Sequence, residues 1–214
     1  MWKYALGIVS LLALFAPGAN AALIASFSQN PSATPTITAT DNGTVTNITA
    51  TDASTTITTG ASGIIPAALF SLNAHSVSAA TTLGSQIIQL FSGTFCFTSA
   101  AGCGGTNFIS GTFSDAAFGA AGGPGLTVNV NNPPDTLSLT SDVVPASSLI
   151  APNTFNLTFA DLAPLLGIDG TTIAAFTADF AGNISSAATV PEPMSLALMG
   201  LGLFGLGMVR RRNS

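Results

Sequence analysis

The sequence predicts an all-β protein, in particular an antiparallel β-sandwich of eight or more short strands. Apolar and polar residues alternate with period two in several segments, and turn sequences rich in Gly, Asn and Pro separate them at roughly 10 to 15 residue spacing. No long helical period occurs between residues 22 and 190. A β-solenoid is the alternative, because ITATD at residues 37–41 returns at residues 48–52, although two copies are thin support for a repeat architecture.

Residues 22–62 form a Thr-rich segment in which we expect a hairpin. Thr-x-Thr pairs such as those at residues 36–38 and 44–46 put threonine on one face of a strand and apolar residues on the other. Asp-Asn-Gly at residues 41–43 lies between two such runs and is a strong turn signal. Residues 63–190 then form the body of the predicted β-sandwich.

The body contains one repeated tetrapeptide and one clear alternating strand. SGTF occurs at residues 92–95 and 110–113, and the two copies are expected on facing strands. Residues 154–159 alternate Phe, Leu and Phe with Asn and Thr, which predicts a half-buried strand. Further strands are expected at residues 86–91, 126–130, 136–140 and 171–180. A short helix is expected at residues 161–166, where Asp161 is placed to cap it.

Residues 1–21 have the layout of a secretory signal peptide. A lysine near the start is followed by an apolar run at residues 4–15, which is short of the roughly 20 residues that span a bilayer. Ala19 and Ala21 form the small-x-small pattern that signal peptidase accepts. We therefore expect cleavage between Ala21 and Ala22, and an exported mature chain.

The C-terminal tail, residues 191–214, has three parts. It begins with Pro191, Glu192 and Pro193, and it ends close after Arg210, Arg211 and Arg212. Between them, residues 194–209 carry no charge and would form a helix of about 24 Å, short for a hydrocarbon core of about 30 Å. We expect a short transmembrane helix here, with the arginines on the cytoplasmic side.

This order of motif, short span and basic cluster resembles the PEP-CTERM sorting signal of bacterial envelope proteins. The resemblance covers about the last 25 of 214 residues. It implies that a membrane-embedded exosortase recognises the tail, cleaves near the motif and passes the protein to the cell surface or matrix. Membrane anchorage would then be transient. A plain C-terminal anchor is the alternative.

The composition of residues 22–190 excludes several classes of partner. This span carries eight Asp, one His and neither Lys nor Arg, so its formal net charge is −8. Without basic side chains nothing neutralises phosphate, which argues against nucleic-acid binding and against anionic lipid surfaces. The span also lacks Trp and Tyr, the usual platforms for stacking sugar rings, and its phenylalanines are expected in the core.

Cys96 and Cys103 are the only cysteines of the chain. A pair of cysteines in an exported protein is most simply a disulfide, which here would staple the hairpin between the two SGTF strands. The alternative, a metal site, needs more ligands than the single histidine, His75, supplies.

Calcium is the one cofactor that the acidic residues suggest. Asp41, Asp135 and Asp169 lie in Asn-, Gly- or Pro-rich strings whose oxygens suit a hard cation. No EF-hand pattern is present, and the same residues also build turns. No other metal or cofactor is expected.

The sequence points to a non-enzymatic protein. His75 lacks a G-x-S-x-G partner motif, and no spacing selects a pair of Asp carboxylates for glycoside cleavage. The resemblance implies a structural protein of the cell surface or extracellular matrix, associated with exopolysaccharide in a biofilm. The alternatives are a secreted hydrolase acting on polysaccharide or peptide, and a ligand-binding adhesin with an exposed Phe patch.

Overall fold

Antiparallel strands make up most of the described chain. The computed structural model describes residues 22–31, 36–84, 86–119, 124–129, 134–150 and 152–186. Within these ranges the chain forms thirteen strands and one short 3-10 turn, η2 (Ala146–Ser148). The strands are β1 (Leu23–Gln29), β2 (Ile37–Asp41), β3 (Thr46–Thr59), β4 (Gly63–Ser76), β5 (Thr81–Leu83), β6 (Gln86–Ala100), β7 (Gly104–Phe118), β8 (Gly125–Asn129), β9 (Thr136–Thr140), β10 (Asn153–Ala163), β11 (Ile168–Asp169), β12 (Thr172–Ile173) and β13 (Phe176–Ser186).

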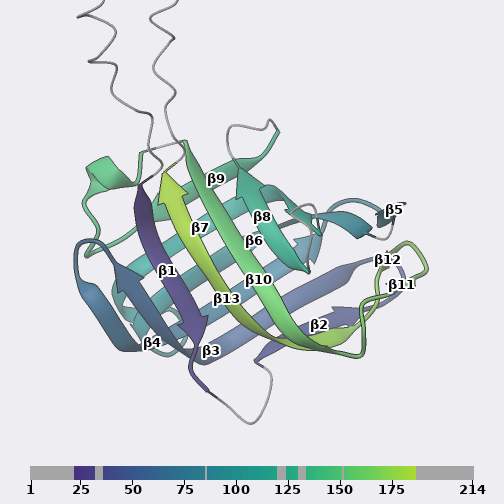
Figure 1. The fold of residues 1–214 in the computed structure, drawn as a ribbon, viewed down its shortest axis with the longest axis horizontal. Helices are drawn as coiled ribbons and strands as arrows, with labels where there is room; N and C mark the ends of the chain where they lie inside the picture. The colour runs from purple at the N-terminus through teal and green to yellow at the C-terminus, as the bar shows by residue number, and fades with distance from the viewer. Residues whose placement is uncertain are drawn as a thin grey trace, which may run out of the picture. The chain divides into compact units, whose positions relative to one another are not determined.

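Eight strands close into a barrel. In the order β6, β4, β3, β1, β13, β10, β8 and β7, each strand pairs antiparallel with the next, and β7 pairs again with β6. Three further strands extend this wall: β9 pairs with β7, β5 pairs with β6, and β2 pairs with both β3 and β13 (Figure 1). The short β11–β12 hairpin forms a separate sheet.

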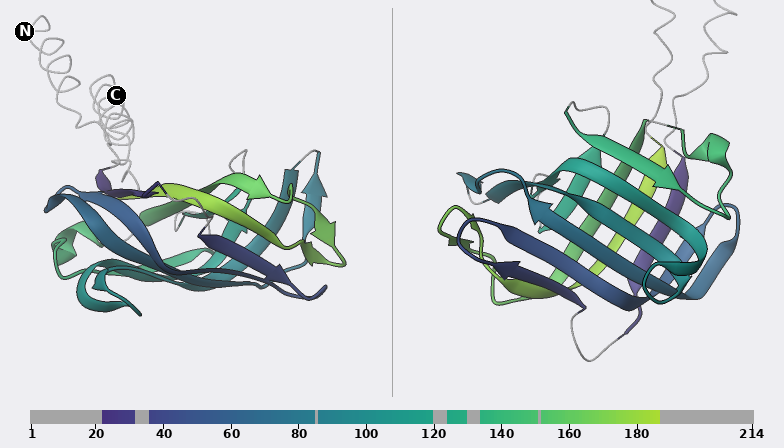
Figure 2. Two further views of the ribbon diagram at one scale, coloured as in Figure 1. Left: turned by 90° about the horizontal axis from the view of Figure 1, so that it is seen from below. Right: turned by 180° about the vertical axis from the view of Figure 1, so that it is seen from behind.

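The barrel is flattened into two layers that face each other across the core (Figure 2). Strands β1, β13, β10 and β8 form one layer, and β3, β4, β6, β7 and β9 form the other, which lies behind the first in Figure 1. The all-β prediction is confirmed, but a closed barrel takes the place of the predicted β-sandwich. The β1–β3 and β7–β8 ladders join the two layers, so the strand edges that a sandwich leaves open are paired. The β-solenoid is wrong because all the strand pairs in the described chain are antiparallel.

The expected hairpins form at the expected positions. Strands β2 and β3 pair on either side of the Asp-Asn-Gly turn, in which Gly43 adopts a positive φ of 81°. The two SGTF copies lie opposite each other on β6 and β7, with Gly93 facing Phe113 and Gly111 facing Phe95. A Cβ on Gly111 would come within 2.9 Å of the Phe95 ring, so glycine makes room for this aromatic residue.

Phenylalanine fills the space between the two layers. Eleven of the twelve phenylalanines between residues 22 and 190 are buried, and Phe108 is half-buried against the same cluster. The buried ones are Phe27, Phe70, Phe91, Phe95, Phe97, Phe113, Phe118, Phe155, Phe159, Phe176 and Phe180. Burial of each ring stabilises the fold by about 1.5–3 kcal/mol. None of these residues contributes to an exposed Phe patch, the feature that an adhesin would show.

The expected strand at residues 154–159 is confirmed, but the helix expected directly after it is wrong. Strand β10 continues to Ala163, which pairs with Thr177 of β13. Asp161 has a positive φ of 51° at an irregularity of this ladder, so it bends the strand and caps no helix. Aspartate tolerates this left-handed conformation better than most residues, which is why the same residue type suits both a cap and a bulge.

Residues 22–187 form one compact unit, to which the Thr-rich segment contributes β1, β2 and β3. The two ends of this unit lie together: the backbone N–H of Ala22 donates to Ser186 Oγ, and the backbone N–H of Ser186 donates to the Ala22 carbonyl. The described residues include no helix that is long and apolar enough to cross a membrane. The predicted signal peptide with Ala19 and Ala21, and the tail with its transmembrane segment 194–209, lie outside the described residues.

Candidate binding groove on the outer sheet

A row of uncharged polar side chains crosses the outer face of the layer formed by β3, β4, β6, β7 and β9, and continues onto β2. Register places one such residue of each strand opposite the next, because outward positions recur with period two along every strand. We name these residues the polar row: Thr38 of β2, Thr49 of β3, Asn73 of β4, Thr94 of β6, Thr112 of β7 and Ser138 of β9. With strands about 4.8 Å apart, the row is about 24 Å long.

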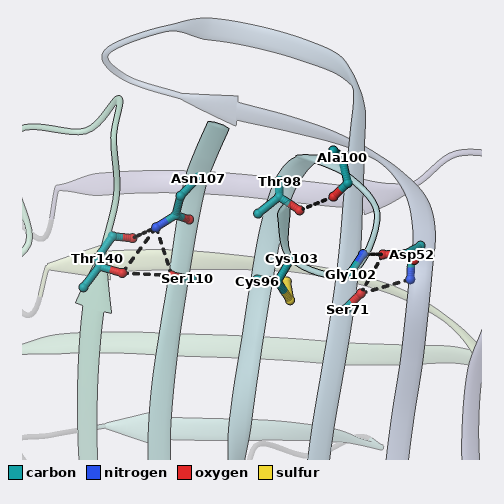
Figure 3. The surroundings of a disulfide bond; sticks show 10 residues. All are labelled: Asp52, Ser71, Cys96, Thr98, Ala100, Gly102, Cys103, Asn107, Ser110 and Thr140. Atoms are coloured by element: carbon teal, nitrogen blue, oxygen red, sulfur yellow. Dashed lines mark hydrogen bonds between the residues drawn. A yellow bond between two sulfur atoms is a disulfide. The ribbon is translucent and has the colours of Figure 1, made fainter. Parts of the chain in front are cut away.

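The polar row differs from its neighbours in hydrogen bonding. The flanking row is the neighbouring pair of outward residues, Ser110 of β7 and Thr140 of β9, which lie opposite each other. Their hydroxyls bond each other at 2.8 Å, and Asn107 Nδ2 donates to both (Figure 3). By contrast, within the described part of the chain only Thr49 of the polar row uses its side chain, donating to the Thr38 carbonyl at 3.3 Å. The other side chains of the row are therefore available to a ligand.

A groove of about 590 Å³ follows the polar row. Five of the six row residues line it, all except Thr38, together with Ser110 and Thr140 of the flanking row. Its residues come from β3, β4, β6, β7 and β9, so the groove crosses the strands.

The predicted disulfide between Cys96 and Cys103 is present and forms part of the groove lining (Figure 3). It joins β6 to the loop before β7, as expected for a staple of the SGTF hairpin. Asp52 holds the same loop from the other side: its Oδ1 accepts from Gly102 N at 2.8 Å and from Ser71 Oγ at 3.1 Å. Asp52 therefore orders the loop beside the groove.

Replacing Cys96 and Cys103 together by alanine is expected to lower the free energy of unfolding by about 2 kcal/mol. The crosslink closes a short loop, with a sequence separation of 7, so it removes little entropy from the unfolded chain. Urea unfolding of the variant and of the oxidised and reduced wild type measures the difference. Reduced wild type should match the variant, and equal stability of the oxidised and reduced protein would contradict this expectation.

His75 lies beside a serine, but the geometry of a catalytic triad is incomplete. The register sets His75 on β4 opposite Ser92 on β6. Ser92 Oγ accepts a long hydrogen bond of 3.4 Å from the backbone N–H of Asp115, not from His75. The exposed His75 side chain makes no hydrogen bond to any described residue, so it is not oriented by a carboxylate as a triad histidine is.

Two of the three calcium candidates lie in neighbouring turns. Asp41 Oδ1 accepts from Gly43 N at 3.1 Å and from the Thr172 hydroxyl, while its Oδ2 is buried without a hydrogen-bond partner. Asp169 lies in the β11–β12 hairpin that carries Thr172, and it is exposed. Asp135 precedes β9, in a different part of the barrel. Among the described residues no three His, Cys, Asp or Glu side chains converge as a metal site would require.

The threonines of the polar row were visible in the sequence, but the row itself was not. Only the pairing of Thr94 with Thr112 could be predicted from the sequence, because it follows from the facing SGTF copies. The other members depend on the pairing of strands far apart in the chain, such as β7 with β9.

The comparisons with known proteins identify the tail alone. The family model described as the PEP-CTERM protein-sorting motif matches residues 189–212, which include Pro191, Glu192, Pro193 and the three arginines. Comparison with curated proteins and with solved structures gave no match. The chain thus carries a PEP-CTERM sorting motif at its C-terminus, which implies an exported protein of the cell envelope that exosortase processes.

Proposed function

We propose that the processed chain is a non-enzymatic structural protein of the cell surface or extracellular matrix, associated with exopolysaccharide. The observation that carries this proposal is that the bounds of the folded unit coincide with the two expected cleavage sites. The compact unit begins at Ala22, directly after the predicted signal cleavage site, and ends at Ala187, just before the sorting motif. Removal of both tails would leave every strand of the barrel in place.

The chemistry of the barrel supports the same role. Its interior is packed with phenylalanine, while Thr, Ser and Asn occupy many outward positions of both layers. Uncharged hydroxyl and amide groups exchange hydrogen bonds with water and with sugar hydroxyls alike. Such a surface suits a hydrated polysaccharide gel, and the absence of Lys and Arg between residues 22 and 190 limits electrostatic attachment to anionic polymers.

Fractionation of the native host tests this function. We expect the processed protein in the matrix fraction, and we expect enzymatic degradation of the exopolysaccharide to release it. A strain without exosortase should lose the protein from the matrix. Recovery of the processed protein as a free species in the medium, with no change on degradation of the polymer, would contradict matrix association.

The hydrolase alternative has a separate test. Purified processed protein is incubated with the host exopolysaccharide, and new reducing ends are counted against a His75→Ala variant. We expect no activity in either sample. Chain cleavage that disappears in His75→Ala would show that His75 is required for hydrolysis and would favour the hydrolase.

A further inference from the structure

The polar row has three properties that together define a ligand. It is long, extending over about 24 Å, and it repeats once per strand at about 4.8 Å. It contains no charged side chain. Five of its side chains make no hydrogen bond to a described residue, and a groove of about 590 Å³ runs along it. A ligand that fits must be extended, repetitive and uncharged.

We propose that the groove along the polar row binds a neutral, linear polysaccharide that crosses strands β3, β4, β6, β7 and β9. This inference rests on the proposed function and names its ligand class and site. The spacing between strands is close to the length of one pyranose unit in an extended glycan, so each strand presents one side chain per sugar. About five units would cover the five strands.

The side chains suit a sugar in two ways. A threonine hydroxyl both donates and accepts, as does an asparagine amide, and sugar hydroxyls need both. The threonine methyl groups offer apolar contact to the C–H faces of the ring, in a groove without Trp or Tyr. Each hydrogen bond contributes modestly against water. Binding is therefore weak for each sugar unit and accumulates along the polymer.

The charge of the barrel selects neutral over anionic glycans. Eight Asp and no Lys or Arg lie between residues 22 and 190, so a uronic-acid polymer meets repulsion with no compensating cation. Asp52 lies against the groove loop, where its Oδ1 accepts hydrogen bonds from Gly102 N and Ser71 Oγ, and its negative charge adds to the repulsion of an anionic polymer.

Calorimetric titration of the mature exported protein with cello-oligosaccharides of two to six units tests the site. Affinity should rise with each added unit and level off near five or six. Oligogalacturonate of six units should bind at least about ten-fold more weakly than cellohexaose. The double variant Thr94→Val/Thr112→Val removes two hydroxyls and keeps the shape, and it should weaken cellohexaose binding about 10- to 30-fold.

Two controls separate the site from general effects. Thr158→Val removes an exposed hydroxyl of β10, on the other layer, and should leave binding unchanged. Thr94→Ser/Thr112→Ser keeps both hydroxyls and should retain affinity within a few-fold. Thermal unfolding of each variant confirms that the barrel is intact.

The outcomes distinguish this inference from the proposed function. The inference is overturned if wild type does not bind cellohexaose, if Thr158→Val weakens binding as much as the double variant, or if oligogalacturonate binds as tightly. Matrix association in the host is measured independently with the same double variant. Its persistence alongside any of those results would leave the proposed function standing and remove only this site.

Discussion

Replacing Phe155 by alanine is expected to lower the free energy of unfolding by about 3–5 kcal/mol. Phe155 is fully buried, and its ring stacks on Phe95 with centroids 4.4 Å apart and planes 6° from parallel. Its ring centroid also lies 6.2 Å from that of Phe27 and 6.0 Å from that of Phe113. Phe155 belongs to one layer of the barrel and Phe95 to the other, so the substitution leaves a cavity at the centre of the core. Urea unfolding of the mature protein measures the loss.

Two matched variants show whether burial causes this loss. Phe155→Leu keeps most of the volume and should cost clearly less than Phe155→Ala. Phe108→Ala removes a half-buried ring at the edge of the cluster and should cost less than half as much. A cost below about 1 kcal/mol for Phe155→Ala would mean that the two layers do not pack on this ring.

Replacing Pro191, Glu192 and Pro193 together by alanine is expected to abolish surface release almost completely. These residues lie within the matched sorting motif, and this motif implies processing by exosortase. The variant should accumulate in the membrane fraction with residues 194–214 attached. The barrel should unfold at the same temperature as that of wild type, because the compact unit ends at Ala187.

The matched control for this tail variant lies just beyond the motif. Asn213→Ala/Ser214→Ala changes two residues outside the matched range 189–212 and should leave release unchanged. Normal release of the Pro191/Glu192/Pro193 variant would show that the tail is not read as a sorting signal. Accumulation of the Asn213/Ser214 control in the membrane fraction would show instead that any change near the C-terminus blocks surface release.

Features of the fold that depend on residues close together in the chain could be predicted from the sequence. Alternation of Phe155, Leu157 and Phe159 with polar residues gave a correct half-buried strand, since the period of a strand is a property of neighbouring residues. The disulfide and the facing SGTF copies were also correct, because only a short turn separates the partners.

Closure of the barrel and the polar row did not follow from the sequence. A sandwich and a barrel need the same alternation of inward and outward residues, so the pattern does not reveal whether β3 pairs with β1 across the two layers. The groove depends on pairings such as Thr112 with Ser138, between residues on strands that are not consecutive in the chain. Asp161 showed the limit of local reasoning in another way, because tertiary pairing of β10 with β13 overrode its capping preference.

The intact mass of the protein released from its native host tests the central claim, that a barrel is exported and trimmed at both ends. We predict the mass of a chain that begins at Ala22 and ends near Pro191, which is the compact unit with a short remnant of the motif. A higher mass that still includes residues 194–214 would mean that the tail remains as an anchor, and would contradict processing by exosortase.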